Sequence, residues 1–182
     1  MKTTSIIVLL FLISSTLFSQ NRNSDYIKVN GTGTLISSWK GSDSEDIWGV
    51  LANGNKISIS KKQSFIYVTV YATNVGTHLI ALDLENDEIK DTLVKVYEYD
   101  FDKNGGKELV VIYSTAFSFL NVEVFRFVSG ISERIGNFKG QFEVYLENDT
   151  VFLPIGSQGI GDEFMYKDYS FYKLILHNPE NN

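Results

Sequence analysis

The feature that most constrains this chain is a series of short segments in which apolar and polar residues alternate between turn-forming residues. Residues 57–60 alternate strictly, and residues 65–71 are rich in the β-branched and aromatic side chains that favour extended backbone. Such segments recur about every 8–12 residues along the chain. This spacing predicts an all-β fold of antiparallel hairpins, arranged as a propeller-like array or as a sandwich or barrel.

The segments can be placed individually from their patterns. We expect residues 78–82 and 93–99 to form the two sides of one hairpin, with the acidic stretch 83–88 at its tip. The one candidate helix, 114–120, is disfavoured by its Ser, Thr and Phe content. The dipeptide Asn-Gly, which tolerates the positive φ of tight turns, occurs at 30–31, 53–54 and 104–105. The expected strands are 57–60, 65–71, 78–82, 93–99, 109–113, 122–127, 142–146, 151–153 and 171–176.

The N-terminal segment predicts a secretory signal peptide. Lys2 precedes an apolar core over residues 6–17, and polar residues return at 19–22. We therefore expect a signal peptide over 1–19, a single all-β domain over 20–182, and a secreted or periplasmic location. An uncleaved anchor is the alternative. No later segment has the run of about 18 apolar residues that a membrane span needs, so none is expected after cleavage.

The composition argues against several kinds of chemistry. The 182 residues include 16 Lys and Arg against 22 Asp and Glu, a formal net charge of −6, which argues against binding to nucleic acid. The absence of Cys excludes thiol catalysis, thiolate metal sites and disulfides. The two imidazoles, His78 and His177, flank apolar segments, and no nucleophile motif accompanies them.

One acidic segment, residues 100–108, has the residue types and spacing of a metal-binding loop. Its acidic and amide side chains alternate along the chain, so their oxygen atoms can converge inside one tight turn. No soft ligand or histidine lies nearby, so a hard ion such as Ca²⁺ is expected rather than zinc or copper. The alternative is a metal-free turn, since Asp, Asn and Gly favour turns by themselves. The candidate ligands are Asp100, Asp102, Asn104, Gly106 through its carbonyl, and Glu108.

The same segment resembles a known class of calcium loop. It matches the start of an EF-hand loop, D-x-[DN]-x-[DN]-G, but has Val111 at the twelfth position and strand-like flanks. It is more similar to the D-x-D-x-[DN]-G-x-x-[DE] hairpin loops of FG-GAP repeats in integrin-alpha-like β-propellers, over about twenty residues. The resemblance implies a structural calcium ion held through the side chains of Asp100, Asp102, Asn104 and Glu108.

Other candidate sites are weaker. The glycine-rich stretch 156–163 matches neither a phosphate-binding loop nor a nucleophile elbow, and it predicts an irregular loop with some potential for recognition. The acidic cluster 83–88 lacks the glycine of a tight loop and predicts a solvated turn. The aromatic residues that could stack on a sugar or peptide are Trp39, Trp48, Tyr166, Tyr169 and Tyr172, and the two tryptophans flank a polar loop.

These observations predict a non-enzymatic binding module outside the cytoplasm, with a protein or glycan partner and one structural Ca²⁺. A specific alternative is a periplasmic inhibitor or immunity protein that blocks a cell-wall hydrolase. The enzymatic alternative is a carboxylate-based glycan hydrolase, for which the 22 acids supply the residue type but no distinctive pair.

Overall fold

The structure, a computed structural model, describes residues 27–63, 65–72, 76–82, 92–114, 119–128, 131–141, 143–155 and 160–174. Within these ranges it contains strands and no helix, which confirms the all-β prediction. The expected signal peptide and most of the candidate helix lie outside the described residues. The strands are β1 (Lys28–Gly31), β2 (Thr34–Lys40), β3 (Ile47–Val50), β4 (Lys56–Lys62), β5 (Phe65–Ala72), β6 (Gly76–Ala81), β7 (Leu93–Tyr99), β8 (Glu108–Ser114), β9 (Leu120–Val128), β10 (Ile131–Gly140), β11 (Glu143–Glu147), β12 (Thr150–Pro154), β13 (Gly161–Lys167) and β14 (Ser170–Leu174).

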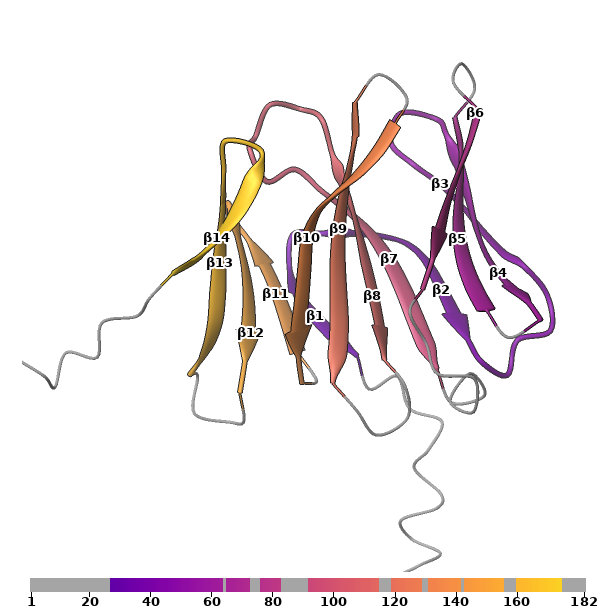
Figure 1. Ribbon diagram of the computed structural model, residues 1–182, viewed down its shortest axis with the longest axis horizontal. Coiled ribbons are helices and arrows are strands. Elements are labelled where there is room, and N and C mark those ends of the chain that lie inside the picture. Colours follow the sequence, from indigo (N-terminus) through magenta and orange to yellow (C-terminus); the bar gives the residue numbers. More distant parts are fainter. Residues whose placement is uncertain are drawn as a thin grey trace, which may run out of the picture.

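The strands form three sheets that lie side by side as three layers (Figure 1). The N-terminal sheet has the order β3-β4-β5-β6, the middle sheet β10-β9-β8-β7-β2, and the C-terminal sheet β1-β11-β12-β13-β14. Each contains four consecutive antiparallel strands, and β2 and β1 extend the middle and C-terminal sheets at one edge. The described strands are therefore stacked as in a sandwich and do not close into a barrel.

The middle sheet is covered on both faces, which gives the molecule two apolar cores. Every residue of β7 and of β8 is buried. Because successive side chains alternate across a strand, Tyr97 and Val110 face the C-terminal sheet, while Val96 and Val111 face the N-terminal sheet. A strand buried on both faces needs an almost continuous apolar run, and residues 109–113 supply one.

One prediction about strand pairing is wrong. Segments 78–82 and 93–99 do form β6 and β7, but these strands belong to different sheets and do not pair. They instead contribute to the same core, where Ile80 and Val94 both lie. The Asn-Gly pair at 30–31 lies at the end of β1, which pairs in parallel with β11 of the C-terminal sheet. Local alternation predicts that a strand forms, but it does not specify the partner of that strand.

No element in the described part of the chain is a helix suited to crossing a membrane.

Candidate metal-binding loop and the adjacent cavity

The predicted metal loop connects the two central strands of the middle sheet, β7 and β8. Tyr99 pairs with Glu108 at the base of the hairpin, so residues 100–107 form the loop between them. Lys103 and Gly105 adopt positive φ, 57° and 88°, which turns the chain back on itself. The prediction that strands rather than helices flank this segment is confirmed.

Hydrogen bonds inside the loop give it a defined shape. Asp100 accepts a bond from the Gly105 amide at 2.9 Å, and Asn104 accepts one from the Gly106 amide at 2.6 Å. Asp102 accepts bonds from the amide nitrogen of Asn104 at 3.1 Å and from its side-chain nitrogen at 2.7 Å. The loop therefore brings the acidic and amide side chains together, with several of their oxygens engaged in the turn.

Glu108 occupies the base of the loop in an unusual electrostatic setting. Its side chain is buried, and one carboxylate oxygen accepts a bond from the Phe101 amide at 3.2 Å. Burial, together with the charges of Asp102 and Asp100, raises the pKa of Glu108 from 4.5 to about 7. Within the described residues no Lys or Arg forms an ion pair with this carboxylate.

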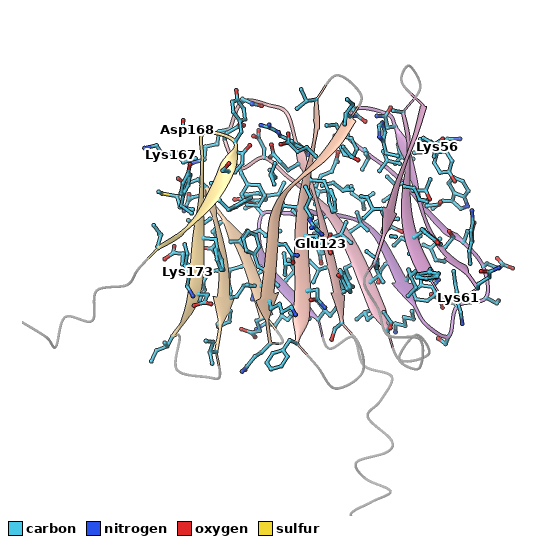
Figure 2. All side chains as sticks on the ribbon, viewed as in Figure 1. Lys56, Lys61, Glu123, Lys167, Asp168 and Lys173 are labelled. Carbon is cyan, nitrogen blue, oxygen red and sulfur yellow. The ribbon has the colours of Figure 1, made fainter. Side chains whose placement is uncertain are left out.

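A second buried acid in the described chain, Glu123, has a cationic partner. Glu123 on β9, labelled in Figure 2, is as buried as Glu108. Its two oxygens contact the Tyr113 hydroxyl at 2.9 Å and an Arg134 nitrogen at 3.5 Å. Glu123 thus has a cationic partner, whereas Glu108 has two carboxylates as neighbours.

Asp100 also lacks a partner for one oxygen. Its Oδ2 atom accepts the Gly105 bond, but Oδ1 is buried and has no hydrogen-bond partner in the described part of the structure. A buried acceptor without a donor is costly and calls for a ligand. The loop thus has unfilled acceptor capacity at Asp100 and a buried negative charge at Glu108.

Phe101 anchors the loop to the core, a role that the sequence analysis did not identify. Only 1% of its surface is exposed, and its ring packs 4.6 Å from Tyr99, 5.1 Å from Phe171 and 5.8 Å from Tyr166, measured between centroids. A single large apolar residue between two acids was the signal available in the sequence. The anchor places Asp100 and Asp102 on either side of a fixed point.

The predicted ligands share one loop but are not assembled into a cage. In the ranges that the structure describes, no group of three His, Cys, Asp or Glu side chains is placed to hold a metal ion. The bonds from Asn104 to Asp102 account for part of this, because they engage both Asp102 oxygens with nitrogen donors of Asn104. Side-chain rotation at these exposed positions would be needed to form a complete coordination shell.

A cavity of about 420 Å³ lies beside the loop, at one end of the three sheets. Asp102 and Glu108 of the loop form part of its wall. Glu98, near the end of β7, also lines the cavity and accepts the Ala52 amide at 2.9 and 3.0 Å. The full lining is Ala52, Asn53, Glu98, Asp102, Asn104, Gly105, Gly106, Lys107, Glu108, Arg126, Phe127, Val128, Tyr166 and Tyr169.

The C-terminal sheet contributes two tyrosines to this cavity. Tyr166, near the end of β13, is buried. Its pKa is raised above the usual value, mainly by this burial and then by the negative charges of Glu108 and Asp102. Tyr169 lies in the β13–β14 turn, whose Lys167 and Asp168 are labelled in Figure 2. The Arg126 guanidinium lies 4.7 Å from the centre of the Tyr169 ring.

The other sequence candidates are distributed over the molecule. Trp39, one of the aromatic residues that could stack on a sugar or peptide, is fully buried between the middle and N-terminal sheets. Trp48 is exposed and stacks on Tyr71 at 5.3 Å, and Tyr172 is exposed on β14. His78 lies within β6 against Phe127. Residues 83–88, 156–159 and 177 lie outside the described residues.

Comparison with protein-family models, with curated proteins and with solved structures finds no match for this chain.

Proposed function

We propose that this protein is a calcium-binding β module that acts outside the cytoplasm by binding a partner, a protein or a glycan, without catalysis. The observation that carries the proposal is the position of Glu108. It is a buried carboxylate beside two further acids, at the wall of a cavity, and no cation in the described chain pairs with it. A bound divalent cation would offset this buried negative charge.

The donors in the loop suit a hard cation. Ca²⁺ prefers carboxylate, amide and carbonyl oxygens and tolerates irregular geometry. Asp100, Asp102 and Glu108 would supply carboxylate oxygens, Asn104 its side-chain oxygen and Gly106 its carbonyl. Because Asp102, Asn104 and Gly106 are exposed, part of the binding energy would be spent on ordering them. We expect a weak site, with a dissociation constant of about 10⁻⁴ to 10⁻³ M, which extracellular calcium concentrations can fill.

Binding is favoured over hydrolysis by the placement of the acids. Glycoside hydrolysis needs two carboxyl groups flanking one scissile bond. Glu98 faces the N-terminal sheet, where it accepts the Ala52 amide, and Glu108 faces the C-terminal sheet. Both carboxylates line the cavity, but the alternation of the strands directs them to opposite faces of the middle sheet, and both oxygens of Glu98 accept the Ala52 amide.

The test is thermal unfolding of the purified mature chain in excess CaCl₂ and in EDTA, with MgCl₂ as a third condition. At a tenfold excess over the dissociation constant, binding to the folded state alone adds about 1.4 kcal/mol of stability. This corresponds to an increase of about 3–6 °C in the midpoint for a chain of this length. A smaller response to Mg²⁺ is expected, because that ion demands a stricter octahedral geometry.

A matched pair of variants locates the site. Asp102→Asn should abolish most of the Ca²⁺ response, since it removes one ligand charge. Asp168→Asn removes one charge from another exposed turn, where Asn tolerates the φ of 50° equally well, and should leave the response intact. Equal midpoints in CaCl₂ and EDTA for the unmodified chain would refute the calcium site.

The proposed location has a separate test. Protein recovered from outside the cytoplasm of the expressing cell should have an intact mass that lacks the first nineteen residues. Full-length protein confined to the cytoplasm would contradict export without bearing on the calcium site.

A further inference from the structure

We infer that the cavity beside the β7–β8 loop binds one neutral, hydroxyl-rich ring, that is, a sugar unit of a glycan. The inference rests on the proposed function, because it names the partner class that the module recognises. It is carried by the walls of the cavity, by one buried hydroxyl without a well-aligned hydrogen bond, and by one strained aromatic residue.

The size and polarity of the cavity fit a single ring. A volume of about 420 Å³ lies within the usual range for small-ligand pockets. The wall contains acceptors on Glu98 and Asp102 and donors on Lys107 and Arg126. A lipid chain would leave these polar groups unsatisfied, whereas a ring with hydroxyl groups can both donate to the acids and accept from the bases.

Tyr166 provides a buried polar group at the wall of this space. It lines the cavity, only 5% of its surface is exposed, and the Arg126 side chain is the polar group that faces its hydroxyl. That hydroxyl makes no well-aligned hydrogen bond in the described structure, so folding has removed it from water without fully replacing the lost bond. A ligand hydroxyl in the cavity would supply that bond.

Tyr169 has a backbone conformation that is unfavourable for a tyrosine. Asp168 and Tyr169 follow one another with φ of 50° and 66°, as in the tight hairpin turns that prefer Asn-Gly or Asp-Gly. A tyrosine in the left-handed region is strained, yet this ring remains 60% exposed beside the cavity, with Arg126 4.7 Å from its centre. Strain retained at an exposed aromatic residue points to a role in contact with a ligand.

The balance of charge favours a neutral ligand over an ionic one. Three carboxylates line the cavity with Lys107 and Arg126, and Arg126 is already paired with Glu133 at 2.6 Å. With a divalent cation in the loop, these charges approximately cancel. An anion would then face the acids, and a cation would compete with the metal. The apolar face of a sugar ring can instead pack on Tyr169 while its hydroxyl groups meet the polar wall.

The experiment is calorimetric titration of the mature chain, in CaCl₂ and in EDTA, with chitotriose, cellotriose and maltotriose as neutral probes of different linkage. Spermidine serves as a cationic probe. We expect at least one trisaccharide to bind with a dissociation constant below about 10 mM, and spermidine to bind more weakly in CaCl₂. Failure of all three sugars, or preference for spermidine, would overturn the inference.

Two variants assign any binding to the cavity. Tyr169→Gly should abolish sugar binding and at the same time raise the unfolding midpoint, because glycine relieves the strained φ. Tyr166→Phe should weaken binding about threefold to tenfold while the midpoint changes little, since the lost hydroxyl makes no well-aligned hydrogen bond. The control Tyr172→Phe alters an exposed tyrosine of β14 that does not line the cavity and should leave affinity unchanged.

The two proposals can fail separately. A Ca²⁺-dependent midpoint without sugar binding would remove this inference and leave the calcium site. Sugar binding that is equal in CaCl₂ and EDTA, with no midpoint shift, would remove the calcium site and leave this inference. Sugar binding that both Tyr169→Gly and Tyr166→Phe retain would place the sugar elsewhere and overturn the assignment to the cavity.

Discussion

Two hairpin turns of this molecule contain the same Asn-Gly pair, one between β3 and β4 and one between β7 and β8. Gly54 and Gly105 have almost the same φ, 85° and 88°. In each turn the asparagine side-chain oxygen accepts a hydrogen bond from the backbone amide two residues later. The Asn55 amide donates to Asn53 at 3.0 Å, and the Gly106 amide donates to Asn104 at 2.6 Å. The local chemistry that makes the chain turn is therefore shared.

The two turns differ in what surrounds this pair. The β3–β4 turn, residues 51–55, contains no acid of its own, and its Ala52 amide is capped by Glu98 from β7. The β7–β8 loop adds Asp100, Asp102 and Glu108. Since the first turn forms without carboxylates, the three acids of the second exceed what a turn requires. This excess, rather than the Asn-Gly pair, is the feature that indicates a bound cation.

The largest expected effect comes from removing the anchor of each turn. Phe101→Ala should lower the free energy of unfolding by about 3–5 kcal/mol and also abolish the Ca²⁺ response, because the ring positions the acids on both sides. Leu51→Ala, at the buried start of the β3–β4 turn, should cost about 2–5 kcal/mol but preserve the response. Denaturant unfolding with and without CaCl₂ measures both. A retained response in Phe101→Ala would show that the anchor does not position the site.

An intermediate effect is expected from pH. In EDTA the pKa of Glu108 is raised from 4.5 to about 7, so the folded chain holds this proton more tightly than the unfolded chain. The associated stability is fully present below pH 4.5 and is lost as the pH rises through about 7. Thermal midpoints between pH 4.5 and 8 should therefore fall in EDTA and fall less in CaCl₂.

A variant of this acid isolates its contribution. Glu108→Gln should remove this part of the pH dependence and raise the midpoint at pH 8 in EDTA, because no charge is then buried. Glu147→Gln, at the exposed end of β11, serves as the control and should follow the unmodified chain. A pH dependence that survives in Glu108→Gln would assign it to another group.

The smallest effect tests the shared part of the two turns. A Cβ atom added at Gly54 or at Gly105 meets no other atom within 4 Å, so only the positive φ penalises alanine. Gly54→Ala and Gly105→Ala should each cost about 1–2 kcal/mol in EDTA, measured by denaturant unfolding. In CaCl₂ the cost should rise for Gly105→Ala alone. Equal costs in EDTA and in CaCl₂ would indicate that ion binding does not depend on the conformation of the β7–β8 loop.

Strands with strong apolar patterns could be predicted, and those without such patterns could not. Residues 65–71 and 93–99 were identified because their side chains bury at least one face. Strand β10 was missed because it is largely polar, lies at the edge of its sheet and contains an irregularity between Arg134 and Gly136. An edge strand with little buried surface carries little periodic signal.

The candidate site was predictable in part for a similar reason. Four of the five expected ligands lie in one loop and Glu108 lies at its base, because consecutive residues stay close in any fold. The anchoring role of Phe101 and the cavity with Tyr166 and Tyr169 could not be predicted. They depend on β13 and β14 of another sheet, more than fifty residues later in the chain.

The sequence by itself determined the local properties of this protein: extended segments, sharp turns, and a dense acidic stretch between two strands. These follow from side-chain shape and backbone preference over a few residues. Only the tertiary structure decided which strands share a sheet, that Trp39 is buried, and that the acidic loop borders a cavity. Those outcomes depend on how apolar faces from distant segments meet, and no local pattern specifies that choice.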